Sequence, residues 1–84
     1  MATGTPSRAN ARRAAVIGFI DRYITEWGHP PTVREIASGL CIPSTSSVQR
    51  ELEWLRAHGA LSWRAGKPRT FKVNPAAGQI IEEA

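Results

Sequence analysis

The segment from residue 42 to residue 59, IPSTSSVQRELEWLRAHG, gathers side chains that form hydrogen bonds readily. It contains four consecutive hydroxyl residues, Ser44, Thr45, Ser46 and Ser47, and Gln49 and Arg50 follow soon after them. Hydroxyls donate and accept, an amide does both from neighbouring atoms, and a guanidinium presents a planar fork of donors. Only one hydroxyl is needed to cap a helix. We therefore predict that one caps a helix and the others face DNA, whose phosphates and base edges suit these groups. A cap followed by a merely solvated surface is the alternative.

The sequence offers no pattern typical of catalysis or metal binding. The single Cys41, with His29 and His58, does not make a structural zinc site, and one cysteine cannot form an internal disulfide. No nucleophile has a base at a supporting spacing, and no glycine-rich loop is suited to cradling a phosphate. We therefore expect no enzyme, no metal, no cofactor and no small-molecule substrate.

Positive charge is concentrated in two stretches of the chain. The formal net charge is +4, and neither residues 1–13 nor residues 64–72 contain an acidic residue. The basic residues of these stretches are Arg8, Arg12 and Arg13, then Arg64, Lys67, Arg69 and Lys72. Two basic clusters on one small domain favour a polyanionic partner, although a solvated basic surface is the alternative.

Length and composition indicate one small globular domain. The chain has 84 residues, and 42% of them are hydrophobic, which is ordinary for a folded protein. It has no apolar run of about 18 residues that would span a membrane. It also begins without the apolar core of a signal peptide. We expect no membrane association and a cytoplasmic location.

Three helices are predicted before a hairpin. Asn10 is a suitable N-cap for the first helix, and Gly28 is placed to end it in a left-handed conformation. Between them, apolar residues recur at helical spacing: Val16, Phe19, Ile20, Tyr23, Ile24 and Trp27. After two prolines, Thr32 and Glu35 form a capping box that begins a short second helix. That helix should bury Ile36, Ala37 and Leu40.

The third helix begins near Ser44 or Thr45 and ends at Gly59. At about 100° per residue, one face carries Val48, Leu52 and Leu55, and the other carries Ser46, Gln49, Arg50 and Glu53. The stretches 60–64 and 69–73 alternate apolar and polar residues around a turn and predict a two-stranded antiparallel hairpin. The expected fold is mainly α with a small β element, a three-helix winged helix-turn-helix. Residues 1–9 would be a flexible basic arm, residues 10–73 the domain and residues 74–84 a tail.

This plan assigns roles to individual residues. In a helix-turn-helix the second helix of the pair presents its first residues to the major groove. Gln49 would pair with adenine and Arg50 with guanine, while Arg34 would contact a phosphate. The wing would bring Arg64, Lys67 and Arg69 to phosphates or the minor groove.

The three tryptophans have plainer expected roles. Trp27 and Trp63 are expected in the core, and Trp54 at its rim, with a protein contact as the alternative for Trp54.

Several stretches resemble the N-terminal DNA-binding domain of the LexA repressor. They are residues 16–20, 28–37, 46–52 and 67–69, and the most specific is GHPPTVREIA. The resemblance covers about residues 10–73. It implies a transcriptional repressor of the SOS response whose base-reading residues are Ser44, Ser46, Ser47, Gln49 and Arg50. Lys67 and Arg69 would act from the wing.

The sequence departs from this family in two places. Cys41 stands where the family usually has glycine in the turn, and a side chain there costs about 1–2 kcal/mol if the backbone is left-handed. LexA proteins also continue into a dimerising, self-cleaving domain with a serine-lysine dyad, whereas Lys67 and Lys72 are the only lysines here. An excised domain and a natural stand-alone regulator are both compatible with this. A lone domain should bind weakly unless two copies meet on a palindromic site.

Two other hypotheses stay open at this stage. One is a winged helix that docks on a protein through Trp54 and residues 80–83. The other is an architectural factor that bends DNA during recombination.

Overall fold

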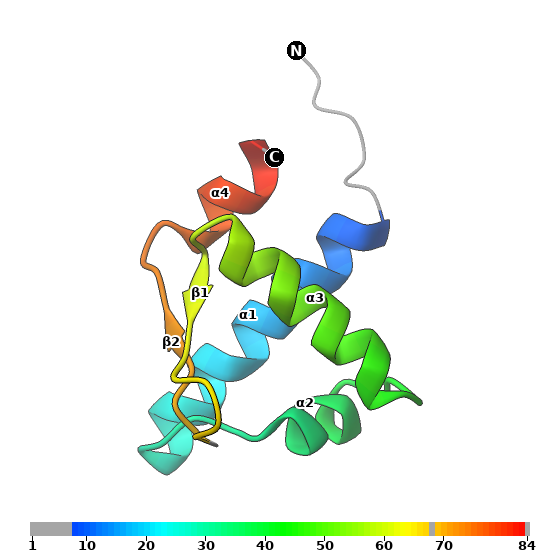
Figure 1. Cartoon of the computed structure of the whole chain (residues 1–84), viewed down its shortest axis with the longest axis vertical. Coiled ribbons are helices and arrows are strands. Elements are labelled where there is room, and N and C mark those ends of the chain that lie inside the picture. The colour runs from blue at the N-terminus through cyan, green and yellow to red at the C-terminus, as the bar shows by residue number, and fades with distance from the viewer. Residues whose placement is uncertain (1–7, 68, 84) are drawn as a thin grey trace.

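The computed structural model describes residues 8–67 and 69–83. In this part of the chain four helices and one small sheet follow in the order α1 (Arg8–Trp27), α2 (Val33–Gly39), α3 (Thr45–Ala57), β1 (Leu61–Ser62), β2 (Lys72–Val73) and α4 (Ala77–Glu83) (Figure 1). The predicted three-helix winged helix-turn-helix with an antiparallel hairpin is confirmed. The fourth helix was not expected.

The first helix, α1, packs its apolar face against the rest of the molecule. Val16 and Ile20 are fully buried, and Gly28 ends the helix with a φ of 79°, as its position predicted. Asn10 lies inside α1 instead of capping it, because the helix already includes Arg8. Trp27 is 64% exposed, so the prediction that it lies in the core was wrong. The helix ends at this residue, and the ring contacts Tyr23, with centroids 6.0 Å apart, but stays largely open to solvent.

The helix-turn-helix consists of α2 and α3. The capping box forms as predicted: Thr32 N donates to Glu35 Oε1 over 2.8 Å, and Glu35 N donates to Thr32 Oγ1 over 3.2 Å. Five residues, 40–44, connect the two helices. Within this turn Cys41 has a φ of 56°, the left-handed conformation that favours glycine.

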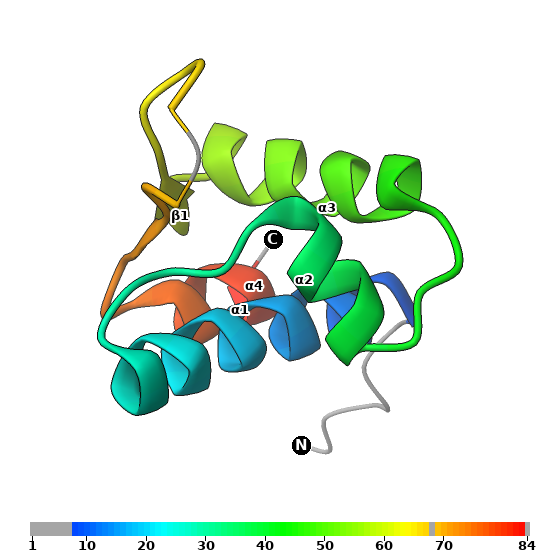
Figure 2. The same cartoon turned by 90° about the horizontal axis from the view of Figure 1, so that it is seen from below.

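The core lies where α1, α2 and α3 meet, and α3 contributes the predicted face. Val48, Leu52 and Leu55 are fully buried together with Ile36 of α2, while Ala37 is nearly so. Leu40 is only partly buried at the edge of this cluster. Figure 2 shows α3 on one side of the molecule, α1 on the other, and α2 crossing between them. The outer face of α3 is therefore left to solvent.

The wing is a short hairpin with a long loop. Leu61 pairs with Val73 and Ser62 with Lys72, so the paired strands are shorter than the alternating pattern predicted. Phe71 is buried, and Trp63 is half-buried in a T-shaped contact with it, with ring centroids 5.4 Å apart. These two aromatic residues anchor the loop of residues 63–71 to the helices.

The segment expected to be a tail folds onto the domain. Ala77 and Ile81 of α4 are buried at 2% and 3% exposure, and α4 packs against α1. Asn10 Nδ2 of α1 donates to the carbonyl of Ile81 over 3.3 Å. The expected N-terminal arm falls mainly on residues 1–7, which lie outside the described residues. Arg8 and Ala9 already belong to α1.

Candidate nucleic-acid interface

The hydroxyl run at the start of α3 divides into a cap and an outward-facing group. Ser44 is the N-cap, and its Oγ accepts a hydrogen bond from Ser46 N over 3.1 Å. The side chains of Thr45 and Ser46 are exposed, whereas Ser47 is half-buried. The prediction that one hydroxyl caps the helix is confirmed for Ser44. The run therefore offers Thr45 and Ser46 most openly to a partner.

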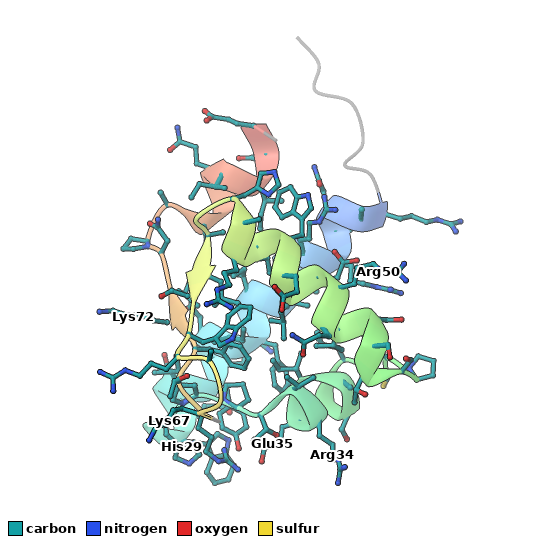
Figure 3. The ribbon with its side chains drawn as sticks, in the orientation of Figure 1. His29, Arg34, Glu35, Arg50, Lys67 and Lys72 are labelled. Carbon is teal, nitrogen blue, oxygen red and sulfur yellow. The ribbon has the colours of Figure 1, made fainter. Side chains whose placement is uncertain are left out.

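Gln49 and Arg50 lie on the exposed face of α3. Gln49 Nε2 donates to Glu53 Oε2 over 3.1 Å, so the amide is held one turn along the helix. Arg50 points outward from α3 (Figure 3). Within residues 8–67 and 69–83, no ion pair or hydrogen bond engages the side chain of Arg34, Arg50 or Lys67. These three cations are available to an external anion.

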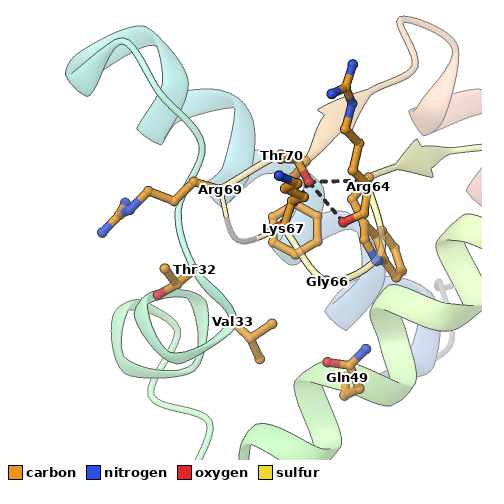
Figure 4. Close-up of a pocket in the computed structure, with 10 residues that line it drawn as sticks. Thr32, Val33, Gln49, Arg64, Gly66, Lys67, Arg69 and Thr70 are labelled. Atoms are coloured by element: carbon orange, nitrogen blue, oxygen red, sulfur yellow. Dashed lines mark hydrogen bonds between the residues drawn. The ribbon is translucent and has the colours of Figure 1, made fainter.

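The wing cations do not all point the same way. Figure 2 shows the wing loop rising on the same side of the molecule as α3. Lys67 lies on this loop, whereas Lys72 extends from β2 away from α3 (Figure 3). Arg64 and Arg69 extend in different directions from the loop (Figure 4). The basic stretch 64–72 is therefore not one patch.

Arg69 is engaged by a partner from α2. Its Nη1 donates to Glu35 Oε1 over 3.0 Å and its Nη2 donates to Glu35 Oε2 over 2.9 Å, and Nη1 also reaches the Pro30 carbonyl at 3.3 Å. The hydrogen bonds from Arg69 and from the Thr32 amide lower the pKa of Glu35 to about 2. The carboxylate correspondingly raises the pKa of Arg69. Arg69 is thus tied to the first turn of α2.

A hollow of about 220 Å³ separates the wing loop from the helix-turn-helix. Thr32 and Val33 line it from the start of α2, and Gln49 lines it from α3 (Figure 4). Lys67 and Thr70 line it from the wing. Thr70 Oγ1 accepts from Arg64 N over 2.9 Å and donates to the Lys67 carbonyl over 3.0 Å, which closes the loop beside the hollow. The arrangement forms a notch next to α3 with an apolar wall from Val33, Trp63 and Phe71, and Lys67 lines it as well.

The basic stretch near the N-terminus is partly used inside the fold. Arg13 Nε donates to Glu51 Oε1 over 3.1 Å, and the guanidinium carbon lies 3.8 Å from the centroid of the Trp54 ring. Trp54 also stacks on His58 with centroids 3.7 Å apart, and it packs at the edge of the core, as expected. Arg13 is therefore a structural cation. It cannot be counted toward the charge available to a polyanion.

Two ion pairs that fix cations within the fold were not predicted from the sequence. The second role of Glu35, as partner of Arg69, had no local signal because 34 residues separate the pair. The pairing of Glu51, by contrast, did have a signal in the sequence. Glu51 lies beside Val48, Leu52 and Leu55 on the core side of α3, and an acidic residue there needs a cationic partner. Arg13 is that partner.

Comparison with known proteins places the chain in a family. The family model described as the LexA DNA-binding domain matches residues 7–70. The chain belongs to the LexA DNA-binding domain family. The match covers the helix-turn-helix and the wing loop as far as residue 70, and it stops before β2 and α4. The family model describes a DNA-binding domain rather than a catalytic one.

Several LexA repressors are similar to this LexA-family domain. The LexA repressor of Limosilactobacillus fermentum is 33% identical over 76 residues, which are 90% of this chain and 36% of that protein. The LexA repressor of Lactiplantibacillus plantarum is 37% identical over 73 residues, 87% of this chain and 35% of its own length. The chain thus spans about a third of the curated relatives it matches. Within the part of the chain that the structure describes, no helix is long and apolar enough to cross a bilayer.

Proposed function

We propose that this domain binds double-stranded DNA sequence-specifically and represses transcription by occupying an operator. In this proposal α3 enters the major groove, and the wing contacts the backbone or the adjoining minor groove. One observation carries it. The exposed polar start of α3 and the cationic wing loop lie on one side of the molecule, and the fold gives Arg34, Arg50 and Lys67 no partner among the described residues.

Base recognition is assigned to the exposed face of α3. Arg50 would donate two hydrogen bonds to guanine, a contact that gives about 1–3 kcal/mol of discrimination. Gln49 would exchange its contact with Glu53 for adenine. Ser44, Thr45, Ser46 and Ser47 would contact phosphates and base edges, with Ser44 doing so while it caps the helix. Small side chains at this end let the helix approach the duplex closely.

Backbone binding is assigned to the cations around α3. Lys67 on the wing lines the hollow beside Gln49, and Arg34 of α2 lines a second hollow with Thr45, Ser46 and Gln49. A phosphate of the DNA backbone would lie in or near the first of these hollows, with Arg64 contributing at longer range. Each neutralised phosphate releases counterions, so affinity should fall steeply with salt.

The number of copies on DNA follows from the size of the domain. One small domain contacts a single half-site, so we propose a weak homodimer on a palindromic site, with half-sites about 10 base pairs apart or a multiple of this. Selecting bound duplexes from a random pool distinguishes a single half-site from a palindrome. Such a repressor, of the SOS type, would act in the cytoplasm.

Two substitutions test the base and backbone assignments separately. Arg50→Ala should relax preference at one position by about 1–3 kcal/mol. Lys67→Ala should weaken binding to all sequences and reduce the slope of log K against log salt by about 1. Lys72→Ala is the matched control, because this lysine points away from α3. If Arg50→Ala and Lys67→Ala both bind as the parent does, the groove assignment is wrong.

The competing hypotheses make different predictions. A protein-docking surface on Trp54 and residues 80–83 has little free area, because Trp54 lies between Arg13 and His58 and Ile81 is buried. An architectural factor would bend its site, which a circular-permutation mobility assay detects. A repressor that acts by occupancy needs no large bend.

A further inference from the structure

We infer that Arg69 is a positioning residue, which sets the place of the wing relative to α2 and α3, and that it does not itself bind a phosphate. This inference rests on the proposed function for its consequence in DNA binding. Its structural basis is the two-point contact between Arg69 and Glu35. From its charge and its position in the wing alone, Arg69 would be expected to bind the DNA backbone.

The geometry of the pair fixes the direction of the side chain. Both terminal nitrogens of Arg69 donate to the two oxygens of Glu35, at 3.0 and 2.9 Å. A bidentate arginine–carboxylate contact restricts orientation as well as distance. The additional contact of Nη1 with the Pro30 carbonyl, at 3.3 Å, adds a third fixed acceptor. The guanidinium donors are thus directed toward the α1–α2 connection instead of outward.

Glu35 is itself held firmly. Its Oε1 accepts from both Thr32 N, at 2.8 Å, and Arg69 Nη1. The carboxylate therefore belongs to the capping box of α2, and its position is set by the first turn of that helix. Through this carboxylate the wing is joined to the helix-turn-helix.

The wing needs such a joint because its own ladder is very short. Only the pairs Leu61–Val73 and Ser62–Lys72 join β1 to β2. The loop then runs through residues 63–71, and Arg69 within it has a left-handed φ of 59°. A residue with a Cβ adopts this conformation only when other contacts hold it. The contact with Glu35 provides that restraint, two residues from Lys67.

The pair is too exposed to act mainly through stability. The side chains of Arg69 and Glu35 are 40% and 36% exposed, and ion pairs of that kind contribute little to folding. Its effect should therefore be on the position of Lys67 and on the width of the hollow beside α3. The predicted phenotype is weaker DNA binding by a protein that is still folded.

Glu35→Gln distinguishes a positioning role of Arg69 from a phosphate-binding role, because the two roles predict opposite changes in DNA affinity. Glutamine at this position retains the capping box, but it cannot form the charged bidentate pair. If Arg69 positions the wing, Glu35→Gln should weaken binding to a selected duplex by about five- to tenfold. If Arg69 binds phosphate directly, removing the nearby negative charge should leave affinity equal or higher. That second result would overturn the inference.

Arg69→Lys and the double variant give two independent checks. Lysine keeps the charge and binds phosphate as a point charge, but it cannot form the planar fork. We expect Arg69→Lys to lose about as much affinity as Glu35→Gln, because neither variant can form the bidentate pair. Arg69→Ala combined with Glu35→Gln should bind no more weakly than Arg69→Ala alone. Additive losses in the double variant would contradict the positioning role.

A measurement without DNA keeps this inference separate from the proposed function. Heteronuclear NOE values report the fast motion of backbone amides. In Arg69→Ala they should fall for residues 64–67 and remain unchanged in α3. If the loop amides keep their values, Arg69 does not hold the wing. Failure of the parent protein to bind any duplex would reject the proposed function while leaving this result interpretable.

Discussion

Arg13 of α1 and Glu51 of α3 form an ion pair over 3.1 Å between the two helices, and the Arg13 guanidinium also lies over the Trp54 ring. Glu51 is 8% exposed, and it is the buried charged residue of the described part of the chain. The pair connects the first helix to the proposed recognition helix. The pair therefore helps to set the orientation of α3 relative to α1.

Removing this cation should destabilise the fold. Arg13→Ala leaves the Glu51 carboxylate nearly buried without its ion partner, and we expect a loss of about 2–3 kcal/mol in the free energy of unfolding, somewhat below the cost for fully buried pairs. Urea denaturation measures this loss. Arg12→Ala, on the exposed side of α1, should change stability by less than about 0.5 kcal/mol. Equal stability of the two variants would mean that the ion pair contributes nothing.

The serine run can be divided by substitution into capping and recognition. Ser44→Ala should lower the free energy of unfolding by about 1 kcal/mol, because the Ser46 amide loses its acceptor. Ser44→Asp should restore most of it, since aspartate caps equally well. Ser46→Ala should leave stability within about 0.5 kcal/mol and alter only DNA binding. A stability loss at Ser46 that matched the loss at Ser44 would contradict this division.

The turn between α2 and α3 is strained at Cys41. A side chain at a φ of 56° costs about 1–2 kcal/mol, and the extra freedom of glycine in the unfolded chain returns about 0.5–1 kcal/mol of that. We therefore expect Cys41→Gly to stabilise the domain by about 0.5–1 kcal/mol. Cys41→Ala is the matched control, because it keeps the Cβ and should unfold near the parent midpoint. No difference between the two variants would show that the turn is unstrained.

The Glu35 carboxylate should give the domain a specific dependence on acid. Its pKa is about 2 in the folded protein, against an ordinary value of 4.5. A lowered folded pKa means that its contribution is complete above 4.5 and is lost as the pH falls toward 2. The difference in urea midpoint between the parent and Glu35→Gln should be small, because the pair is exposed, and should close between these values. In an Arg69→Ala background the same difference should depend less on pH, because the largest cause of the shift is gone.

The last helix should contribute measurably to stability. Ile81 of α4 is 3% exposed against α1, so Ile81→Ala should cost about 2–4 kcal/mol. Ile80→Ala, at a half-buried position, should cost less, and Glu82→Ala should be close to neutral. Thermal unfolding of the three variants measures the order of their stabilities. If Ile81→Ala and Glu82→Ala unfold together, α4 is not docked in solution.

Much of the helix-turn-helix could be predicted because its signals are local. The capping box of Thr32 and Glu35, the cap at Ser44 and the left-handed Gly28 and Gly59 each depend on a few neighbouring residues. The α3 core face follows from helical periodicity. By contrast, α4 has only Ala77 and Ile81 buried over two turns. So short a pattern is too weak to predict a helix without the α1 surface that receives it.

What the sequence by itself determined is the order of the helices, the turn residues and the polar face of α3, since these depend on neighbours a few positions apart. Tertiary structure alone decided which cationic side chains remain available to an external anion. Arg13 and Arg69 are paired with Glu51 and Glu35, and Lys72 points away from α3, while Arg34, Arg50 and Lys67 stay open among the described residues. Charge patterning cannot make this distinction, because the acidic partners come from distant parts of the chain and are brought into contact only by packing.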